Sequence, residues 1–266
     1  MNSSKGALKA VKLLEEIGFD EITQMPMDIF VSGLGATLIE ESLTNCDGKI
    51  IKGRKKTLIK INSDIPYEGK KRFTIAHEIG HYLLHEKLEI HNENSNTLNW
   101  FMTTENQAKQ GIQEKEANEF ATELLMPSKI FQKEAQSKAF SPELIKSLSD
   151  RFKTSITSTL FRYCELKDLH PIFIVFIYNG TVKYWKKSQD LYVKVKDIVK
   201  LKPPVDSVAQ EYIDANYEFI YSGKEKAQSI EKSTWFELDQ YTKNTPFFEY
   251  CIPTKQYKTL ISVIWE

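Results

Sequence analysis

One short segment constrains the fold more than any other part of the chain: residues 77–81, His-Glu-Ile-Gly-His, an HExxH pattern. Residues 73–87 around it carry apolar side chains at helical spacing, which predicts a helix. Four residues advance a helix by about 400°, so His77 and His81 lie on one face and can bind the same zinc ion. Zinc lowers the pKa of a bound water to about 7, and Glu78 is placed to accept its proton as a general base.

A zinc site of this kind needs a third protein ligand, and the sequence limits where that ligand lies. The three-histidine pattern HExxHxxGxxH is excluded because Leu84 and Lys87 stand at the required positions. The remaining possibility is a glutamate on a second helix, and residues 113–126 have strong helical periodicity. Glu114, near the start of that helix, is the favoured ligand, and Glu116 is the alternative.

Composition limits which metal ligands and which binding partners are expected. The chain has 266 residues, with 36 Lys+Arg and 36 Asp+Glu, so net charge provides no general attraction to nucleic acids or anionic membranes. Its three cysteines, Cys46, Cys164 and Cys251, form no CxxC pair, so a metal site must use histidines and carboxylates. The chain starts with polar residues, and its longest apolar run, residues 172–178, is too short to span a bilayer. We therefore expect a cytoplasmic protein with no membrane contact.

The distribution of patterns along the chain predicts an α+β fold. Helical patterns dominate residues 1–140, with a few strands before the HExxH helix, and two further helices fit residues 141–168. After this point the composition shifts toward strands, with an Asn179-Gly180 hairpin signal. We expect one domain with the HExxH helix in residues 1–140, a helix-turn-helix-like segment in 141–168, and a smaller antiparallel α+β domain in 169–266. Strands are predicted at residues 172–178, 181–186, 235–238, 247–252 and 260–265.

Two blocks of sequence resemble a known family. Residues 72–85, RFTIAHEIGHYLLH, and residues 114–127, EKEANEFATELLMP, are similar to the ImmA/IrrE family of metallopeptidases. The resemblance covers roughly residues 7–165 and implies a mainly helical, zincin-like peptidase domain of the gluzincin type. By motif position it implies His77, His81 and Glu114 as metal ligands.

The same resemblance implies a function. Members of this family are intracellular, and characterised ones cleave helix-turn-helix repressors. We therefore expect a zinc metalloendopeptidase that hydrolyses a peptide bond in a regulatory protein, with Glu78 activating zinc-bound water. The alternative is a catalytically silent, zinc-stabilised module that sequesters a repressor or toxin partner. Residues 169–266 match no motif, and a role in sensing or substrate recruitment is expected for them.

Several smaller features have competing interpretations. His85 continues the i+4 row of histidines, and packing or capping is favoured over a supporting role at the metal. Asn118, one turn after Glu114, is placed to accept a hydrogen bond from a ligand histidine. Residues 148–157 resemble a DNA-reading helix-turn-helix, but few basic residues lie nearby, so no direct nucleic-acid binding is expected. Arg72, Tyr82 and the polar segment 88–111, predicted to be a loop, are candidates for stabilising the oxyanion.

Overall fold

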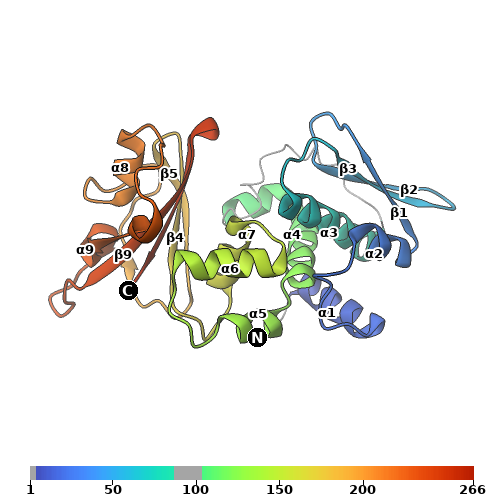
Figure 1. Ribbon diagram of the computed structural model, residues 1–266, viewed down its shortest axis with the longest axis horizontal. Helices are drawn as coiled ribbons and strands as arrows, with labels where there is room; N and C mark the ends of the chain where they lie inside the picture. The colour runs from blue at the N-terminus through green and yellow to red at the C-terminus, as the bar shows by residue number, and fades with distance from the viewer. Residues whose placement is uncertain (1–3, 87–103) are drawn as a thin grey trace. The chain divides into compact units, whose positions relative to one another are not determined.

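The structure is a computed structural model that describes residues 4–86 and 104–266 (Figure 1), and for residues 104–110 it describes the backbone only. The fold is α+β, as predicted. The chain divides into two compact units: a first unit of residues 1–134 and 146–162, and a second unit of residues 135–145 and 163–266. The separate helical domain at 141–168 stays a prediction.

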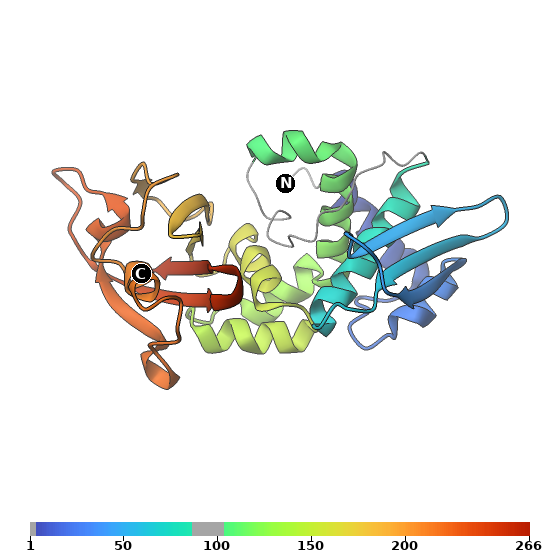
Figure 2. The ribbon, with the colours of Figure 1, turned by 90° about the horizontal axis from the view of Figure 1, so that it is seen from above.

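The first unit combines helices with one small sheet. Its strands form a three-stranded sheet in the order β1-β3-β2, with β1 parallel and β2 antiparallel to β3. Figure 2 shows this sheet beside α3, the helix that carries the HExxH pattern. The elements, the last three of which also include residues of the second unit, are α1 (Lys5–Ile17), α2 (Met27–Gly33), β1 (Ala36–Glu41), β2 (Gly48–Lys52), β3 (Thr57–Asn62), α3 (Glu68–Leu84), α4 (Thr104–Leu125), α5 (Ser128–Ala135), α6 (Pro142–Phe152) and α7 (Ile156–Glu165).

Helix α3 packs between the sheet and α4, and glycines allow its neighbours to approach closely. A Cβ atom on Gly80 would lie 3.0 Å from the Cα atom of Ala117, so α3 and α4 meet with almost no space between their backbones. A Cβ atom on Gly6 would lie 2.1 Å from the carbonyl oxygen of Glu116, so α1 also lies directly against α4. The core beneath these contacts includes Ile59, Ile61, Ala76, Ile79, Phe120, Ala121 and Leu124.

Helix α4 begins earlier than the sequence predicts. It starts at Thr104, and Gly111 interrupts its helical geometry with φ 81° and ψ 160°. The prediction of a loop through residue 111 is therefore wrong for residues 104–110, while residues 87–103 lie outside the described residues. Apolar periodicity does not extend into this polar first part of α4, which explains why the pattern did not reveal it.

The second unit is built on a five-stranded antiparallel sheet in the order β5-β4-β10-β9-β7. The predicted hairpin is confirmed: Asn179 and Gly180 both have positive φ and join β4 to β5. The strands predicted at 172–178, 181–186, 247–252 and 260–265 are also confirmed, whereas α8 and β7 were not predicted. The elements are β4 (Phe173–Tyr178), β5 (Thr181–Lys187), β6 (Lys194–Val195), α8 (Val208–Asp214), β7 (Ala227–Glu231), α9 (Lys232–Trp235), β8 (Phe236–Glu237), β9 (Pro246–Thr254) and β10 (Thr259–Trp265).

The core of the second unit is aromatic. Phe173, Trp235, Phe236 and Phe247 pack with their ring centroids 5.2 to 6.3 Å apart along the chain of contacts that joins them. Strand prediction at 235–238 was partly correct, because the chain leaves α9 at Trp235 and then forms the two-residue strand β8. These rings fix the short α9 and β8 against the sheet.

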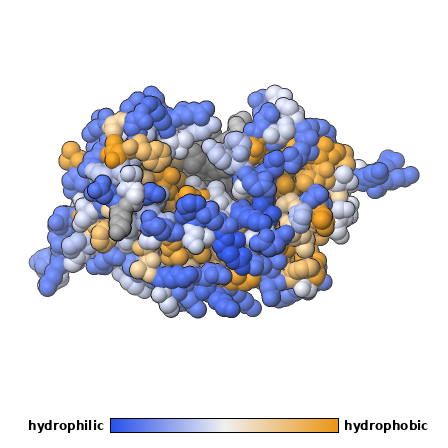
Figure 3. Space-filling model, in the orientation of Figure 1, coloured by the Kyte–Doolittle hydropathy of each residue, from blue (hydrophilic) through white to orange (hydrophobic). Residues whose placement is uncertain are grey.

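The surface is mixed in character. On the face seen in Figure 3, hydrophilic side chains surround small groups of hydrophobic ones. Within residues 4–86 and 104–266, the structure contains no helix that is both long and apolar enough to cross a membrane.

Candidate metal centre

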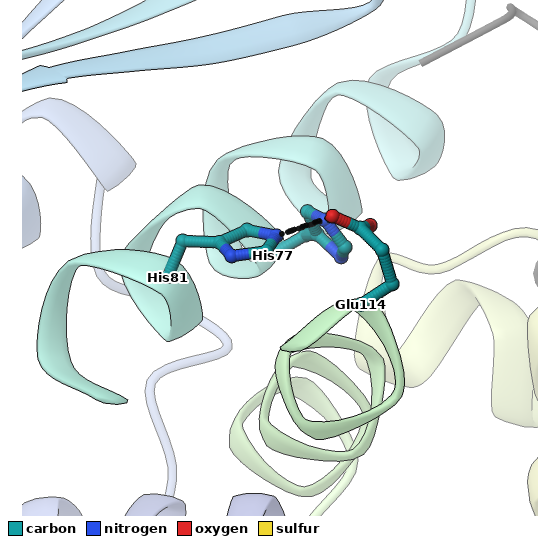
Figure 4. Close-up of side chains that lie close together, drawn as sticks. All are labelled: His77, His81 and Glu114. Atoms are coloured by element: carbon teal, nitrogen blue, oxygen red, sulfur yellow. Dashed lines mark hydrogen bonds and ion pairs between the residues drawn. The ribbon is translucent and has the colours of Figure 1, made fainter. Parts of the chain in front are cut away.

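Three side chains from two helices converge on one point in the first unit (Figure 4). His77 and His81 lie on α3, and Glu114 reaches toward them from α4. The Nε2 atoms of the histidines are 3.0 Å apart, and the carboxylate oxygens of Glu114 lie 3.2 Å from His77 Nε2 and 3.1 Å from His81 Nε2. Both imidazoles are almost completely buried. The structure therefore brings together the residues that the sequence predicted as ligands.

The hydrogen bond at Nδ1 of His77 determines whether Nε2 of the same ring can bind a metal ion. Nδ1 of His77 lies 2.8 Å from Oδ1 of Asn118, and an amide oxygen can only accept a hydrogen bond. The proton of a neutral His77 is therefore on Nδ1, which leaves a lone pair on Nε2. That lone pair faces a carboxylate and a second imidazole. Such a set of electron-pair donors calls for a cation at its centre.

The spacing of the donor atoms fits a tetrahedral metal ion. With bonds of about 2.0–2.1 Å, two ligands of a tetrahedral zinc ion lie about 3.3 Å apart. The observed separations of 3.0, 3.1 and 3.2 Å are close to that value. Two imidazoles and one carboxylate also make up the protein ligands of one class of catalytic zinc site, in which the fourth position is open. The residues at this point can therefore hold a divalent metal ion.

Glu114 is also ionised when no metal is bound. Burial opposes ionisation of the carboxyl group, but the hydrogen bonds and charge of His77 and His81 in their protonated forms outweigh it. These neighbours hold the pKa of Glu114 well below its usual value, so the group is a carboxylate. An ionised carboxylate is the form that binds a metal.

Glu78 lies on α3 between the two histidines and is buried, with 2% of its surface exposed. Strand β2 makes room for it, because a Cβ atom on Gly48 would lie 2.9 Å from Glu78 Oε1. Gly48 begins β2 and borders the carboxylate. Gly48 is thus a residue at the site that pattern analysis did not identify.

Glu116, the alternative third ligand, has different partners. Its Oε2 atom lies 3.0 Å from His85 Nε2 and 2.8 Å from the Lys5 ammonium group. His85 in turn places Nδ1 3.1 Å from His81 Nδ1. Burial lowers the pKa of His85, although its hydrogen bond to Glu116 opposes the change. The structure thus brings Glu114 rather than Glu116 to the paired imidazoles. His85 caps the end of α3, which is one of the two roles that we favoured, and its ring also makes polar contacts.

Lys52, which the sequence did not single out, holds the end of α3. Its ammonium group donates hydrogen bonds to the carbonyl oxygens of His81, Tyr82 and His85. A positive charge at this end of a helix also stabilises the helix dipole. Because His81 lies in the last turn, this lysine fixes the part of α3 that carries the second imidazole.

Two of the candidates for stabilising the oxyanion have other roles. The Arg72 guanidinium donates to the carbonyl oxygens of Ile22 and Met25, at 3.3 and 3.4 Å. The Tyr82 hydroxyl donates to the carbonyl oxygen of Leu34, at 3.3 Å. Both side chains therefore hold α3 against the segment around α2. Most of the third candidate, segment 88–111, lies outside the described residues.

Comparison with known proteins adds a family and a fold. The profile of the family described as the IrrE N-terminal-like domain, peptidase M78, matches residues 31–163, which is half of the chain and includes α3 and α4. No curated protein matches the sequence. Among solved structures, the chain is similar to a Mycobacterium tuberculosis transcriptional regulator, with a TM-score of 0.59 and 12% sequence identity. That likeness covers 98% of this chain and 76% of the other, and at this identity it concerns the fold alone.

Proposed function

Because this chain belongs to the peptidase M78 family of IrrE N-terminal-like domains, we propose that it is a zinc-dependent metalloendopeptidase. The observation that carries the proposal is the convergence of His77, His81 and Glu114 around one point, with a buried glutamate between the two histidines. The expected substrate is a regulatory protein, and a helix-turn-helix repressor is the first candidate, as the family resemblance implies.

The chemistry divides between the metal and the chain. Zinc in such a site supplies a Lewis acid, which polarises a carbonyl group and makes water acidic enough to attack near neutral pH. His77, His81 and Glu114 would hold the ion. The Glu78 carboxylate would take a proton from the attacking water as oxygen bonds to the carbonyl carbon. It would then deliver that proton to the amide nitrogen as the C–N bond breaks.

Burial supports this role for Glu78. The carboxylate lies in a dry environment beside β2, where water does not compete with the proton that it receives. A surface glutamate on the same helix would be solvated and could not discriminate between the reacting water and bulk water. A binding scaffold, in contrast, does not need a buried acid at this position.

The test is Glu78→Gln, which removes the base and preserves the shape of the side chain. The protein would be produced with candidate helix-turn-helix repressors, and fragments would be identified by mass spectrometry. We expect Glu78→Gln to retain zinc and to slow cleavage at least about 100-fold, the lower end of general-base contributions. Glu16→Gln, the same substitution at an exposed position of α1, is the matched control and should cleave normally.

The outcomes separate the mechanism from its alternative. Undiminished cleavage by the Glu78→Gln protein would contradict the proposed mechanism. A wild-type protein that binds zinc and captures a repressor without producing fragments would favour the silent binding module instead.

A further inference from the structure

A line of polar contacts leads outward from His81 to the surface of the first unit. Nδ1 of His81 lies 3.1 Å from Nδ1 of His85, and Nε2 of His85 lies 3.0 Å from Oε2 of Glu116. The same carboxylate oxygen accepts a hydrogen bond of 2.8 Å from the Lys5 ammonium group. His81 and His85 are both buried, whereas Lys5 is mostly exposed. The contacts thus connect the candidate metal centre with α4 and α1.

When His81 binds a metal, only one placement of protons gives each contact between His81, His85 and Glu116 a donor and an acceptor. A ligand nitrogen must keep its lone pair, so the proton of a neutral His81 is on Nδ1. His81 is then the donor toward His85, and Nδ1 of His85 is the acceptor. The proton of His85 is consequently on Nε2, and Glu116 offers a carboxylate that can only accept. Every nitrogen in the line has a complementary partner.

The other ligand histidine is oriented by a simpler arrangement. His77 donates from Nδ1 directly to Asn118, which lies on α4 like Glu116. Helix α4 therefore supplies a metal ligand, Glu114, the direct partner of His77 and the carboxylate that accepts from His85. The close approaches at Gly80 and Gly6 bring α4 within reach of both α3 and α1. His85 lies between His81 and Glu116 and contacts both.

We propose that His85 and Glu116 are positioning residues that fix the tautomer and ring orientation of His81 for metal binding, with Lys5 holding Glu116 in place. The inference rests on the proposed function, because it requires that His81 bind a metal. It assigns to His85 a role in the affinity of the site rather than in packing alone. Outer partners of metal-bound histidines typically contribute about 10- to 100-fold in metal affinity.

Two substitutions at His85 distinguish orientation from packing. His85→Phe preserves a ring but removes the acceptor, whereas His85→Asn loses the ring but places an amide oxygen near the position of Nδ1. The dissociation constant for zinc would be measured by competition with a chromophoric chelator. We expect His85→Phe to weaken binding about 10- to 100-fold and His85→Asn to bind more tightly than His85→Phe. His170→Phe, the same change at a histidine of the second unit, should have no effect.

Glu116 provides a second pair of variants. An amide oxygen can still accept from His85 Nε2, so Glu116→Gln should bind zinc more tightly than Glu116→Leu, which offers no acceptor. In the unaltered zinc-loaded protein, ¹⁵N-resolved NMR of the imidazoles should find the proton of His81 on Nδ1 and that of His85 on Nε2. This second measurement does not depend on whether any variant folds.

Each result is decisive for one claim. The positioning role would be overturned if His85→Phe bound zinc as tightly as His170→Phe, or if His85→Asn bound zinc more weakly than His85→Phe. An NMR spectrum that places the proton of His85 on Nδ1 would also overturn it. None of these results would contradict the proposed peptidase activity. A wild-type protein that does not bind zinc would overturn the proposed function itself.

Discussion

Each unit contains a glutamate that is largely or fully buried, and the two glutamates have different kinds of neighbours. In the first unit, Glu114 faces the Nε2 atoms of two imidazoles. In the second, Glu249 is fully buried, and its hydrogen-bond partners are donors: the backbone N–H groups of Val208 and Ala209, the indole N–H of Trp235, the hydroxyl of Ser262 and the thiol of Cys251. The fold therefore supplies hydrogen-bond donors to Glu249, whereas the group around Glu114 could hold a cation.

The difference shows how the neighbours of a buried acid distinguish a structural role from a functional one. Burial raises the pKa of Glu249, although its hydrogen bonds oppose the change. At Glu114 the histidines outweigh the effect of burial and hold the pKa well below its usual value. The donors around Glu249 come from α8, α9 and β10, so this carboxyl group ties the short elements of the second unit to its sheet.

Replacing each glutamate with glutamine should affect a different property: zinc binding at Glu114 and folding stability at Glu249. Glu114→Gln removes a metal ligand, and we expect it to weaken zinc binding more than about 100-fold. A residue that only hydrogen-bonds to a ligand histidine contributes up to about that factor. Glu249→Gln should leave zinc binding unchanged. It places an amide NH2 against at least one N–H donor, so it should lower the free energy of unfolding by about 1–3 kcal/mol. Chelator competition and urea unfolding measure the two effects.

The pH dependence of the Glu249→Gln effect has a definite sign. Because the folded-state pKa of Glu249 is raised, its stabilising contribution is fully present below the unfolded pKa of about 4.5 and is lost as pH rises through the folded value. The stability difference between wild type and Glu249→Gln should therefore be largest in acid and shrink as pH rises. A difference that grows with pH would show that Glu249 is buried as a stabilised carboxylate.

A further substitution tests whether close helix packing holds the first unit's site together. Gly6→Ala would place a methyl group 2.1 Å from the Glu116 carbonyl oxygen, so α1 must move away from α4. We expect the free energy of unfolding to fall by about 1–3 kcal/mol, the usual cost of overpacking. Gly33→Ala is the matched control in α2, because no atom lies within 4 Å of the added Cβ. Equal unfolding midpoints for the two variants would rule out this packing constraint.

The grouping of His77, His81 and Glu114 could be predicted from the sequence because its geometry is mostly local. The spacing of His77 and His81 follows from one helical turn, and α4 carries its own strong apolar pattern around Ala117 and Phe120. The choice between Glu114 and Glu116 was harder, since two positions along a helix differ by about 200° and only the packing of α4 decides which side faces α3. Gly80 and Ala117 settle it by bringing the helices into contact.

Other features depend on contacts between distant residues and could not be predicted. Lys52 lies in an ordinary strand and gains its role from the carbonyl groups at the end of α3. The helix α8 is short, with only seven residues, and depends on the Glu249 carboxylate, which is far away in the chain. His85 could be placed on the right helix face, but its acceptor role depends on Glu116 and Lys5, which belong to two other helices.

X-ray absorption spectroscopy of the zinc-loaded wild-type protein would show directly which atoms bind the metal. We predict one zinc ion per chain, bound by two imidazoles and by oxygen donors at about 2.0–2.1 Å. A sulfur ligand at about 2.3 Å, a shell without imidazole scattering, or an unchanged spectrum in Glu114→Gln would contradict it.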